Sequence, residues 1–377
     1  MQPNLSDDVY RFIWDGSLIT QGHNPYTVLP ESLMESDKPL KDELDKELYQ
    51  KLNSKKYYTV YPPLNQFIFG FCSLISGNNQ FLNTIMLRIF VLGVEILLLF
   101  IIHKIMYTEG FNKKQFVLYA LNPLMIVELT GNLHFEGIML CFFFISWYFI
   151  YYKDQWKTGA FFYALSISTK LLTLIFLPFF IKRTKPSNLI TFYTIIAVVT
   201  TLTFLPFLNK QLINNIGSSI ALYFQTFEFN ASIYYLIREI GYWVKGYNII
   251  ETAGKVLSII TFLCIVILAI IDKGKRSVEF FKITCFAVCI YYFLSTTLHP
   301  WYLATPLLLS AFTRYKFVLV WSILSPLSYW AYHTTPYTEN LYLVGIEYGI
   351  VFLVLILELC DKIPIDNTIF EKRIIKK

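Results

Sequence analysis

The sequence predicts an all-α polytopic membrane protein, a multi-span helical bundle preceded by a polar N-terminal region. Three observations predict this fold class. Hydrophobic residues make up 55% of the 377 residues and charged residues only 15%, whereas soluble chains carry about 25% charged residues. Apolar runs close to the length of a membrane-spanning helix recur from residue 83 to residue 360. Loops rich in Lys and Arg alternate with loops that contain neither.

Ten apolar runs are candidate spans, and several are short or interrupted by proline or polar residues. They cover residues 83–107, 115–130, 134–152, 159–181, 188–208, 252–272, 277–297, 300–313, 316–333 and 341–360. Interrupted helices in a membrane usually pack around a cavity, because lipid offers no partner for free backbone groups. Run 159–181 has basic residues at both ends, so we expect two half-helices that meet at Ser168-Thr169-Lys170. The sequence therefore predicts that residues 61–360 form a transmembrane domain of about ten to eleven spans, half-helices included.

Basic residues in the loops predict the orientation. The loops at 103–114, 153–157, 182–185, 273–276 and 314–316 and the tail at 361–377 are basic, so we place them in the cytosol. The loops at 77–82, 131–136, 298–302 and 334–340 contain no Lys or Arg, so we place them outside. Residues 1–60, with seven basic and ten acidic residues, then form an extracytoplasmic region. Because no export signal begins this region, we expect a transmembrane helix to precede Met1 in the complete protein.

Composition also argues against several classes. A disordered chain, a disulfide scaffold and a nucleic-acid-binding domain all fit poorly. The six cysteines form no C-x-x-C pair, and most lie in apolar runs, where they are expected to be buried. A divalent metal near Asp7 and Asp8 is left open, but no ligand spacing demands one, and we expect that no cofactor is required.

The first candidate constellation runs from Ser6 to Gly16 and predicts a short helix capped by Ser6 or Asp7. On that helix Asp8, either Arg11 or Phe12, and Asp15 would share a face. Paired carboxylates beside an arginine suit general-base catalysis or the binding of a sugar hydroxyl. The alternative is a capped surface helix whose acids interact with the helix dipole.

Two proline-containing segments follow. Gly22-His23-Asn24-Pro25-Tyr26 predicts a turn, and Tyr61-Pro62-Pro63 predicts the start of an apolar helix. Both are explicable without a function.

Polar residues within the apolar runs are the remaining candidates. Asn122-Pro123 interrupts run 115–130, and His134 and Glu136 follow near its outer end, where they could equally be loop residues near water. Lys170 is costly inside a membrane, so it is expected to face a cavity, a partner or a phosphate, or else to snorkel. Arg88 and Glu95 share a helix face, for either a functional or a structural reason.

A last polar segment, His299-Pro300-Trp301-Tyr302, lies at the predicted outer boundary. The aromatic residues suit a membrane interface on their own. His299 is less easily explained in that way, and it could orient a phosphate or a sugar.

Taken in order, these segments resemble the GT-C superfamily of glycosyltransferases that use polyprenol-phosphate sugars. The likeness is greatest to bacterial integral-membrane mannosyltransferases and to the catalytic subunit of GPI mannosyltransferase I. It covers most of the chain, and no single segment is specific. The segments are Ser6-Asp7-Asp8 with Tyr10, Asn24-Pro25-Tyr26, Tyr61-Pro62-Pro63-Leu64, Arg88 with Glu95, Asn122-Pro123-Leu124 with Gly131-Asn132, Thr169-Lys170 with Pro178, and His299-Pro300-Trp301-Tyr302.

The resemblance implies a GT-C-like helical fold with an extracytoplasmic active site, a lipid-phosphate sugar donor and inversion at the anomeric carbon. It makes Asp7 or Asp8 the catalytic base. The GPI-type enzymes space these acids as Asp-x-Asp, so which of the two adjacent acids acts stays open. Stabilisation of the departing phosphate falls to Lys170, His299 and Arg88. The expected substrate-binding residues are Tyr10, Arg11, Asp15, Tyr61, Arg88, His134, Glu136, Lys170, His299, Trp301 and Tyr302.

We therefore expect an integral-membrane, mannosyltransferase-like enzyme that transfers a hexose from a polyprenyl phosphate to a lipid or glycan acceptor outside the cytosol. The bacterial inner membrane is the favoured location, and the endoplasmic reticulum membrane is the alternative. No nucleic acid is expected as a partner, and the sequence defines no partner subunit. The alternatives are a transporter or lipid flippase, and another GT-C activity such as a polysaccharide polymerase.

Overall fold

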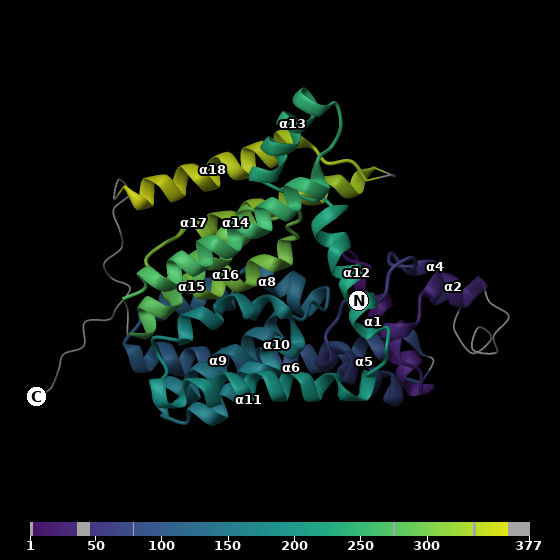
Figure 1. Ribbon diagram of the computed structural model, residues 1–377, viewed down its shortest axis with the longest axis horizontal. Helices are drawn as coiled ribbons and strands as arrows, with labels where there is room; N and C mark the ends of the chain where they lie inside the picture. The colour runs from purple at the N-terminus through teal and green to yellow at the C-terminus, as the bar shows by residue number, and fades with distance from the viewer. Residues whose placement is uncertain (1–2, 36–45, 78, 274–275, 335–336, 361–377) are drawn as a thin grey trace, which may run out of the picture. The chain divides into compact units, whose positions relative to one another are not determined.

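The computed structural model describes residues 3–35, 46–77, 79–273, 276–334 and 337–360 (Figure 1). Within these ranges every element is a helix, apart from a single β-bridge between Phe229 and Thr297. The predicted all-α fold is confirmed. The expected cytosolic tail, 361–377, lies outside the described residues. The chain divides into two compact units, which are described separately. Unit 1 comprises Met1–Leu98, Val127–Thr173 and Ile190–Leu222, and unit 2 comprises Leu99–Ile126, Leu174–Leu189 and Tyr223–Lys377.

Unit 1 begins with short helices. They are α1 (Asp8–Thr20), η1 (Pro25–Thr27), α2 (Pro30–Glu35) and α4 (Lys46–Lys51). The predicted turn at Asn24 is η1, because the Asn24 side chain accepts a hydrogen bond from the Tyr26 N–H (3.0 Å). The apolar helix predicted from the paired prolines is α5 (Pro63–Ser76), which begins at Pro63.

Helices α1 and α5 pack closely against each other (Figure 1). Val9, Phe12 and Leu18 of α1 are buried, and Phe12 stacks on Phe69 of α5 with ring centroids 4.6 Å apart. Gly16 makes this approach possible, because a Cβ at that position would lie 2.5 Å from the Phe69 carbonyl oxygen. The acidic first segment is therefore anchored by an apolar helix face.

The remaining helices of unit 1 are longer and mostly apolar. They are α9 (Glu136–Tyr152) and α10 (Trp156–Thr169), which run side by side (Figure 1), with α6 (Gln80–Glu109), η2 (Ile126–Gly131), η3 (Leu171–Phe180), α11 (Pro186–Phe204), η4 (Leu205–Phe207) and α12 (Leu212–Gln225). Helices α6, η2, η3, α11 and α12 also extend into unit 2. The predicted break in run 159–181 is confirmed, because α10 ends at Thr169 and Lys170 has an extended backbone before η3 begins.

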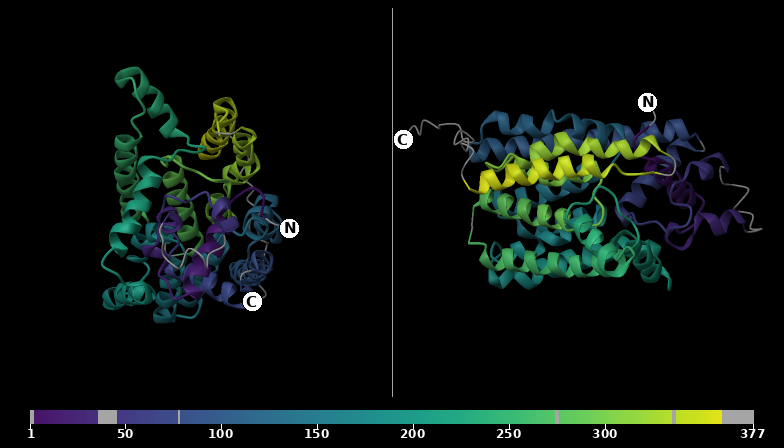
Figure 2. Two further views of the ribbon diagram at one scale, coloured as in Figure 1. Left: turned by 90° about the vertical axis from the view of Figure 1, so that its right-hand side faces the viewer. Right: turned by 90° about the horizontal axis from the view of Figure 1, so that it is seen from above.

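Unit 2 contains α7 (Lys113–Ala120), α8 (Pro123–Met125), α13 (Ile233–Lys245), α14 (Ile250–Ile271), α15 (Ser277–Phe293), η5 (Pro300–Leu303), α16 (Ala304–Ser310), α17 (Phe317–Leu324), η6 (Ser325–His333) and α18 (Leu341–Leu359). Helix α17 packs against α18 (Figure 2). The predicted interruption at Asn122-Pro123 is confirmed. Asn122 caps α8 by accepting from the Leu124 N–H (3.0 Å) and donates to the Ser322 hydroxyl (3.0 Å).

Four helices in the described part of the chain are long and apolar enough to cross a membrane: α6, α14, α18 and the segment Pro186–Phe207. The bent pair Lys114–Gly131 and Glu136–Tyr152 would make a fifth. Large apolar side chains such as Phe100, Ile190 and Ile270 are exposed on these helices, as expected for a surface that faces lipid. The polytopic membrane character is confirmed, whereas the larger count of spans, which included half-helices, stays a prediction.

Candidate active site

Asp7 and Asp8 lie at the N-terminal end of α1. Asp7 occupies the position just before the helix, without a side-chain capping bond, and the Asp8 N–H donates to the Ser6 hydroxyl at 3.3 Å. Asp7 is exposed, and the Asp8 side chain is 25% exposed. Partial burial, and then the negative charge of Asp8, raise the pKa of the Asp7 carboxyl. Two adjacent carboxylates are thus available to a ligand in front of α1.

Behind Asp8 lies a buried imidazole between two carboxylates. Nδ1 of His134 is 3.8 Å from Oδ2 of Asp8, and its Nε2 is 3.2 Å from Oε2 of Glu128. His134 is 2% exposed and Glu128 is fully buried. Asn132 also donates to Oε2 of Glu128 (3.1 Å). We call Asp8, His134 and Glu128 the Asp–His–Glu row.

The local backbone explains this arrangement. Glu128 belongs to η2, a π-helical turn, and Asn132 N–H reaches back to the carbonyl of Val127 at 2.8 Å. Such turns are rare and are frequent at functional sites. The next residue, Leu133, adopts a left-handed backbone with φ of 66°, which is uncommon for a bulky side chain. The chain therefore reverses at this point in a way that places His134 beside Glu128.

Arg11 and Asp15 form a buried ion pair on α1, with Nε of Arg11 2.8 Å from Oδ1 of Asp15. Arg11 also donates to the carbonyl of Tyr57 (2.9 Å), and Gln66 of α5 donates to Oδ2 of Asp15 (3.0 Å). The predicted shared face is confirmed for these two residues. Arg11 is 2% exposed and Asp15 is fully buried, so the pair stabilises the region around α1. This burial argues against direct contact with a substrate, which stays a prediction.

Lys170 pairs with Glu136. Lys170 follows α10, and Glu136 begins α9. Glu136 is 2% exposed, whereas the Lys170 side chain keeps 32% of its surface exposed. Asn65 of α5 fixes the break in the chain by donating to the carbonyl of Thr169 (2.9 Å). The lysine thus has the partner that its position inside an apolar run requires, and its side chain is only partly buried.

The other candidates in unit 1 are partly buried. Arg88 donates to the carbonyls of Thr130 (3.2 Å) and Gly131 (3.0 Å), at the end of the π-helical turn. The ring of Tyr61 packs edge-on against Phe12 with centroids 4.9 Å apart. Tyr10 lies under the ammonium of Lys51, 5.6 Å from its ring centroid.

His299, Trp301 and Tyr302 lie together in unit 2. The His299 ring stacks on Trp301 with centroids 4.3 Å apart, and on Phe229 with centroids 4.9 Å apart. Tyr302 meets His299 edge-on at 5.4 Å. The structure brings these three predicted residues together, and their membership of the site at α1 stays a prediction.

Sequence reasoning missed Glu128. Its signal was an acidic residue inside run 115–130, and such residues are rare in membrane helices and tend to be functional. Among the described residues no three His, Cys, Asp or Glu side chains are grouped to hold a metal ion.

Comparison with known proteins places this geometry in context. Residues 1–184 match the model of the MptA_B family, described as alpha-(1->6)-mannopyranosyltransferase, N-terminal domain. The chain is also 23% identical over 178 residues to alpha-(1->6)-mannopyranosyltransferase A of Corynebacterium glutamicum. That alignment covers 47% of this chain and 34% of the relative, so it spans about a third of the relative's length.

The match to the family covers all candidate residues of unit 1, from Asp7 to Lys170, including Glu128. His299, Trp301 and Tyr302 lie outside it. The predicted resemblance to GT-C-like mannosyltransferases is confirmed.

Proposed function

From the premise that its first 184 residues are similar to the N-terminal domain of the MptA_B mannosyltransferases, we propose that this protein is an integral-membrane mannosyltransferase. Its donor is a polyprenyl-phosphate sugar, and its acceptor is a lipid or glycan on the extracytoplasmic side of the bacterial inner membrane. The sugar is transferred with inversion at the anomeric carbon, and no cofactor is required.

The observation that supports this proposal best is the Asp–His–Glu row. Asp8 is partly exposed, whereas His134 and Glu128 behind it are buried. A buried imidazole beside the partly exposed carboxylate limits the orientations that this carboxylate can adopt, and general-base catalysis requires a defined orientation. His134 and Glu128 are positioning residues in this scheme, and Asp8 is the catalytic base.

The transfer step balances with these groups. The acceptor hydroxyl oxygen forms a bond to the anomeric carbon while the bond from that carbon to the phosphate oxygen breaks. The electron pair of the broken bond leaves with the polyprenyl phosphate, and the acceptor proton moves to the carboxylate of Asp8. Inversion follows because the acceptor and the leaving phosphate lie on opposite faces of the sugar.

Lys170 stabilises the departing phosphate in this proposal. Negative charge develops on the leaving oxygen, and a fixed cation near that oxygen lowers the barrier. The ammonium of Lys170 is held by Glu136 and is still partly exposed. Arg88 contributes to the same region by holding the carbonyls of Thr130 and Gly131, which end the turn that carries Glu128.

A transfer assay tests the proposal. Membranes that contain the full chain are supplied with polyprenyl-phosphate mannose carrying a radiolabelled sugar, and the label is followed into lipid and glycan products. We expect label in a covalent product for the wild type and none above background for the Asp7→Asn, Asp8→Asn double variant. Full activity of the double variant would overturn the mechanism. Movement of the intact donor across the membrane without a product would favour a transporter or flippase.

A further inference from the structure

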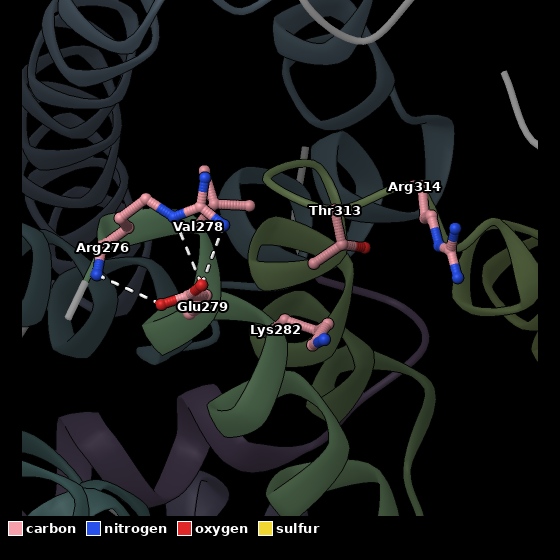
Figure 3. Close-up of a pocket in the computed structure, with 6 residues that line it drawn as sticks. All are labelled: Arg276, Val278, Glu279, Lys282, Thr313 and Arg314. Carbon is pink, nitrogen blue, oxygen red and sulfur yellow. Dashed lines mark hydrogen bonds and ion pairs between the residues drawn. The ribbon is translucent and has the colours of Figure 1, made fainter. Parts of the chain in front are cut away.

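A pocket of about 200 Å³ lies in unit 2, and none of its lining residues is used in the proposed reaction (Figure 3). The start of α15 and the turn between α16 and α17 form it, and its lining residues are Arg276, Val278, Glu279, Lys282, Thr313 and Arg314. A single ordered water needs only about 10–15 Å³. The pocket therefore has room for a larger polar group.

Three of the six residues that line the pocket are cations, and one is a carboxylate. Glu279 accepts from the guanidinium of Arg276 at 2.8 Å, and Figure 3 shows the two side chains joined in this way. Lys282 is exposed and forms no hydrogen bond or ion pair with the residues that the structure describes. The N-terminal end of α15, a helix of 17 residues, adds positive potential. The site is thus built to attract an anion.

The surrounding helices indicate where this anion would come from. Helix α14 is one of the candidate membrane spans and ends at Ile271, a few residues before Arg276. Helix α15, whose start lines the pocket, therefore follows closely in sequence after a candidate membrane span. Basic pockets beside membrane helices are known to suit the head groups of anionic lipids.

We propose that this pocket binds a phosphate group, supplied by an anionic lipid head group or by free phosphate. Arg276 and Arg314 offer the planar donors that match phosphate oxygens, and Lys282 offers a point charge. The site does not depend on the proposed transferase activity, because none of its residues takes part in the transfer step.

The test uses the full chain in detergent micelles that contain phosphatidylglycerol, with phosphatidylcholine as the neutral lipid. Bound lipid is counted by native mass spectrometry over a range of lipid concentrations. We expect the Lys282→Gln, Arg314→Gln variant to bind phosphatidylglycerol roughly 30-fold more weakly than the wild type, since each surface cation contributes about a factor of five. The matched control, Lys210→Gln with Lys245→Gln, removes two exposed cations elsewhere and should bind as the wild type does.

Two further arms separate the sources of the phosphate. Displacement of the lipid by millimolar inorganic phosphate would assign the site to free phosphate, and persistence of the lipid would assign it to the head group. The Glu279→Gln variant should bind several-fold more tightly, because it removes the opposing charge while Gln can still cap α15. Equal phosphatidylglycerol binding by the pocket variant and its control, or unchanged or weaker binding by Glu279→Gln, would overturn the proposal.

Discussion

Nε2 of His134 lies 3.2 Å from Oε2 of Glu128, a carboxylate that is fully buried. Glu128 touches no solvent and cannot itself reach an acceptor, so any effect it has on transfer must pass through His134 to Asp8. We therefore expect Glu128→Gln to lower kcat by roughly tenfold, or about 1.4 kcal/mol of transition-state stabilisation, with little change in KM. A kinetic comparison with Glu47→Gln, which alters an exposed carboxylate of α4, provides the control. A rise in KM at constant kcat would point to a role in binding instead.

The two adjacent acids are expected to differ. Asp8→Asn should lower kcat by about 10²–10⁴-fold, the usual contribution of a general base. Asp7→Asn should lower kcat much less, because the ion-pair contacts of His134 join Asp8 and Glu128 and do not include Asp7. Initial rates of transfer by the single variants, each checked for unchanged thermal unfolding, measure the difference. If Asp7→Asn abolishes transfer and Asp8→Asn does not, the catalytic base is Asp7, whose raised pKa would suit that role.

Substitutions in the pair of Lys170 and Glu136 distinguish a structural role of the lysine from a role in transfer. Lys170→Met leaves the buried Glu136 carboxylate without its partner, which should destabilise the protein by about 3–5 kcal/mol. Adding Glu136→Gln removes the uncompensated charge, so thermal stability should largely return while transfer stays low. Lys51→Met, which breaks an exposed pair with Glu47, should cost at most about 1 kcal/mol. Recovery of transfer together with stability would show that Lys170 is only structural.

The close packing of α1 on α5 makes its own prediction. Gly16→Ala would place a methyl group 2.5 Å from the Phe69 carbonyl oxygen, so the helices must separate. We expect a loss of stability of at least about 1–3 kcal/mol, the usual cost of overpacking, together with weaker transfer because α1 carries Asp8. Gly93→Ala on α6 is the matched control, since nothing lies within 4 Å of its added methyl group. Equal melting temperatures for the two variants would contradict the packing described.

A pH dependence is expected from Glu339 in unit 2. Burial is the main cause that raises the pKa of its carboxyl above the ordinary value of 4.5, and the charge of Glu228 raises this pKa further. Hydrogen bonds from Tyr235 and Asn230 and the charge of Arg238 act in the opposite direction. The folded state therefore holds this proton more tightly than the unfolded state. The contribution of protonated Glu339 to the free energy of unfolding is complete below pH 4.5, and it is lost as the pH rises through the pKa of Glu339 in the folded state.

The Glu339→Gln variant keeps an acceptor for Tyr235 but cannot ionise. Its melting temperature relative to the wild type should therefore rise as the pH increases from about 4.5 towards neutrality. Thermal unfolding at a series of pH values measures this difference, with Glu47→Gln as the control for a surface carboxyl. A difference that does not change with pH would contradict the assigned cause.

Much of the fold could be predicted from sequence because its signals are local. Paired prolines marked the start of α5, and a proline after Asn122 marked the break before α8. A lysine in an apolar run marked the end of α10. These effects arise within a few residues, since proline removes a donor and a charge resists burial. The shared helix face of Arg11 and Asp15 was predicted for the same reason, because helical spacing places them on one side of α1.

The site depends on contacts between distant segments, and these could not be predicted. Glu128 meets Asp8 through His134 only because η2 is π-helical and Leu133 takes a left-handed backbone. Glu136 meets Lys170 across 34 residues of sequence. No periodicity encodes such turns, so the sequence indicated the residue types of the site but not their partners.

The most direct test of transfer from a polyprenyl-phosphate donor compares two sugar donors with the purified full chain in proteoliposomes. Polyprenyl-phosphate mannose and a nucleotide-activated mannose, each radiolabelled in the sugar, are supplied with a membrane lipid extract as the source of acceptor. We expect labelled product from the lipid donor alone, and in Asp8→Asn we expect this product to fall at least about 100-fold. Product formed from the nucleotide sugar instead, or undiminished transfer by Asp8→Asn, would contradict this expectation.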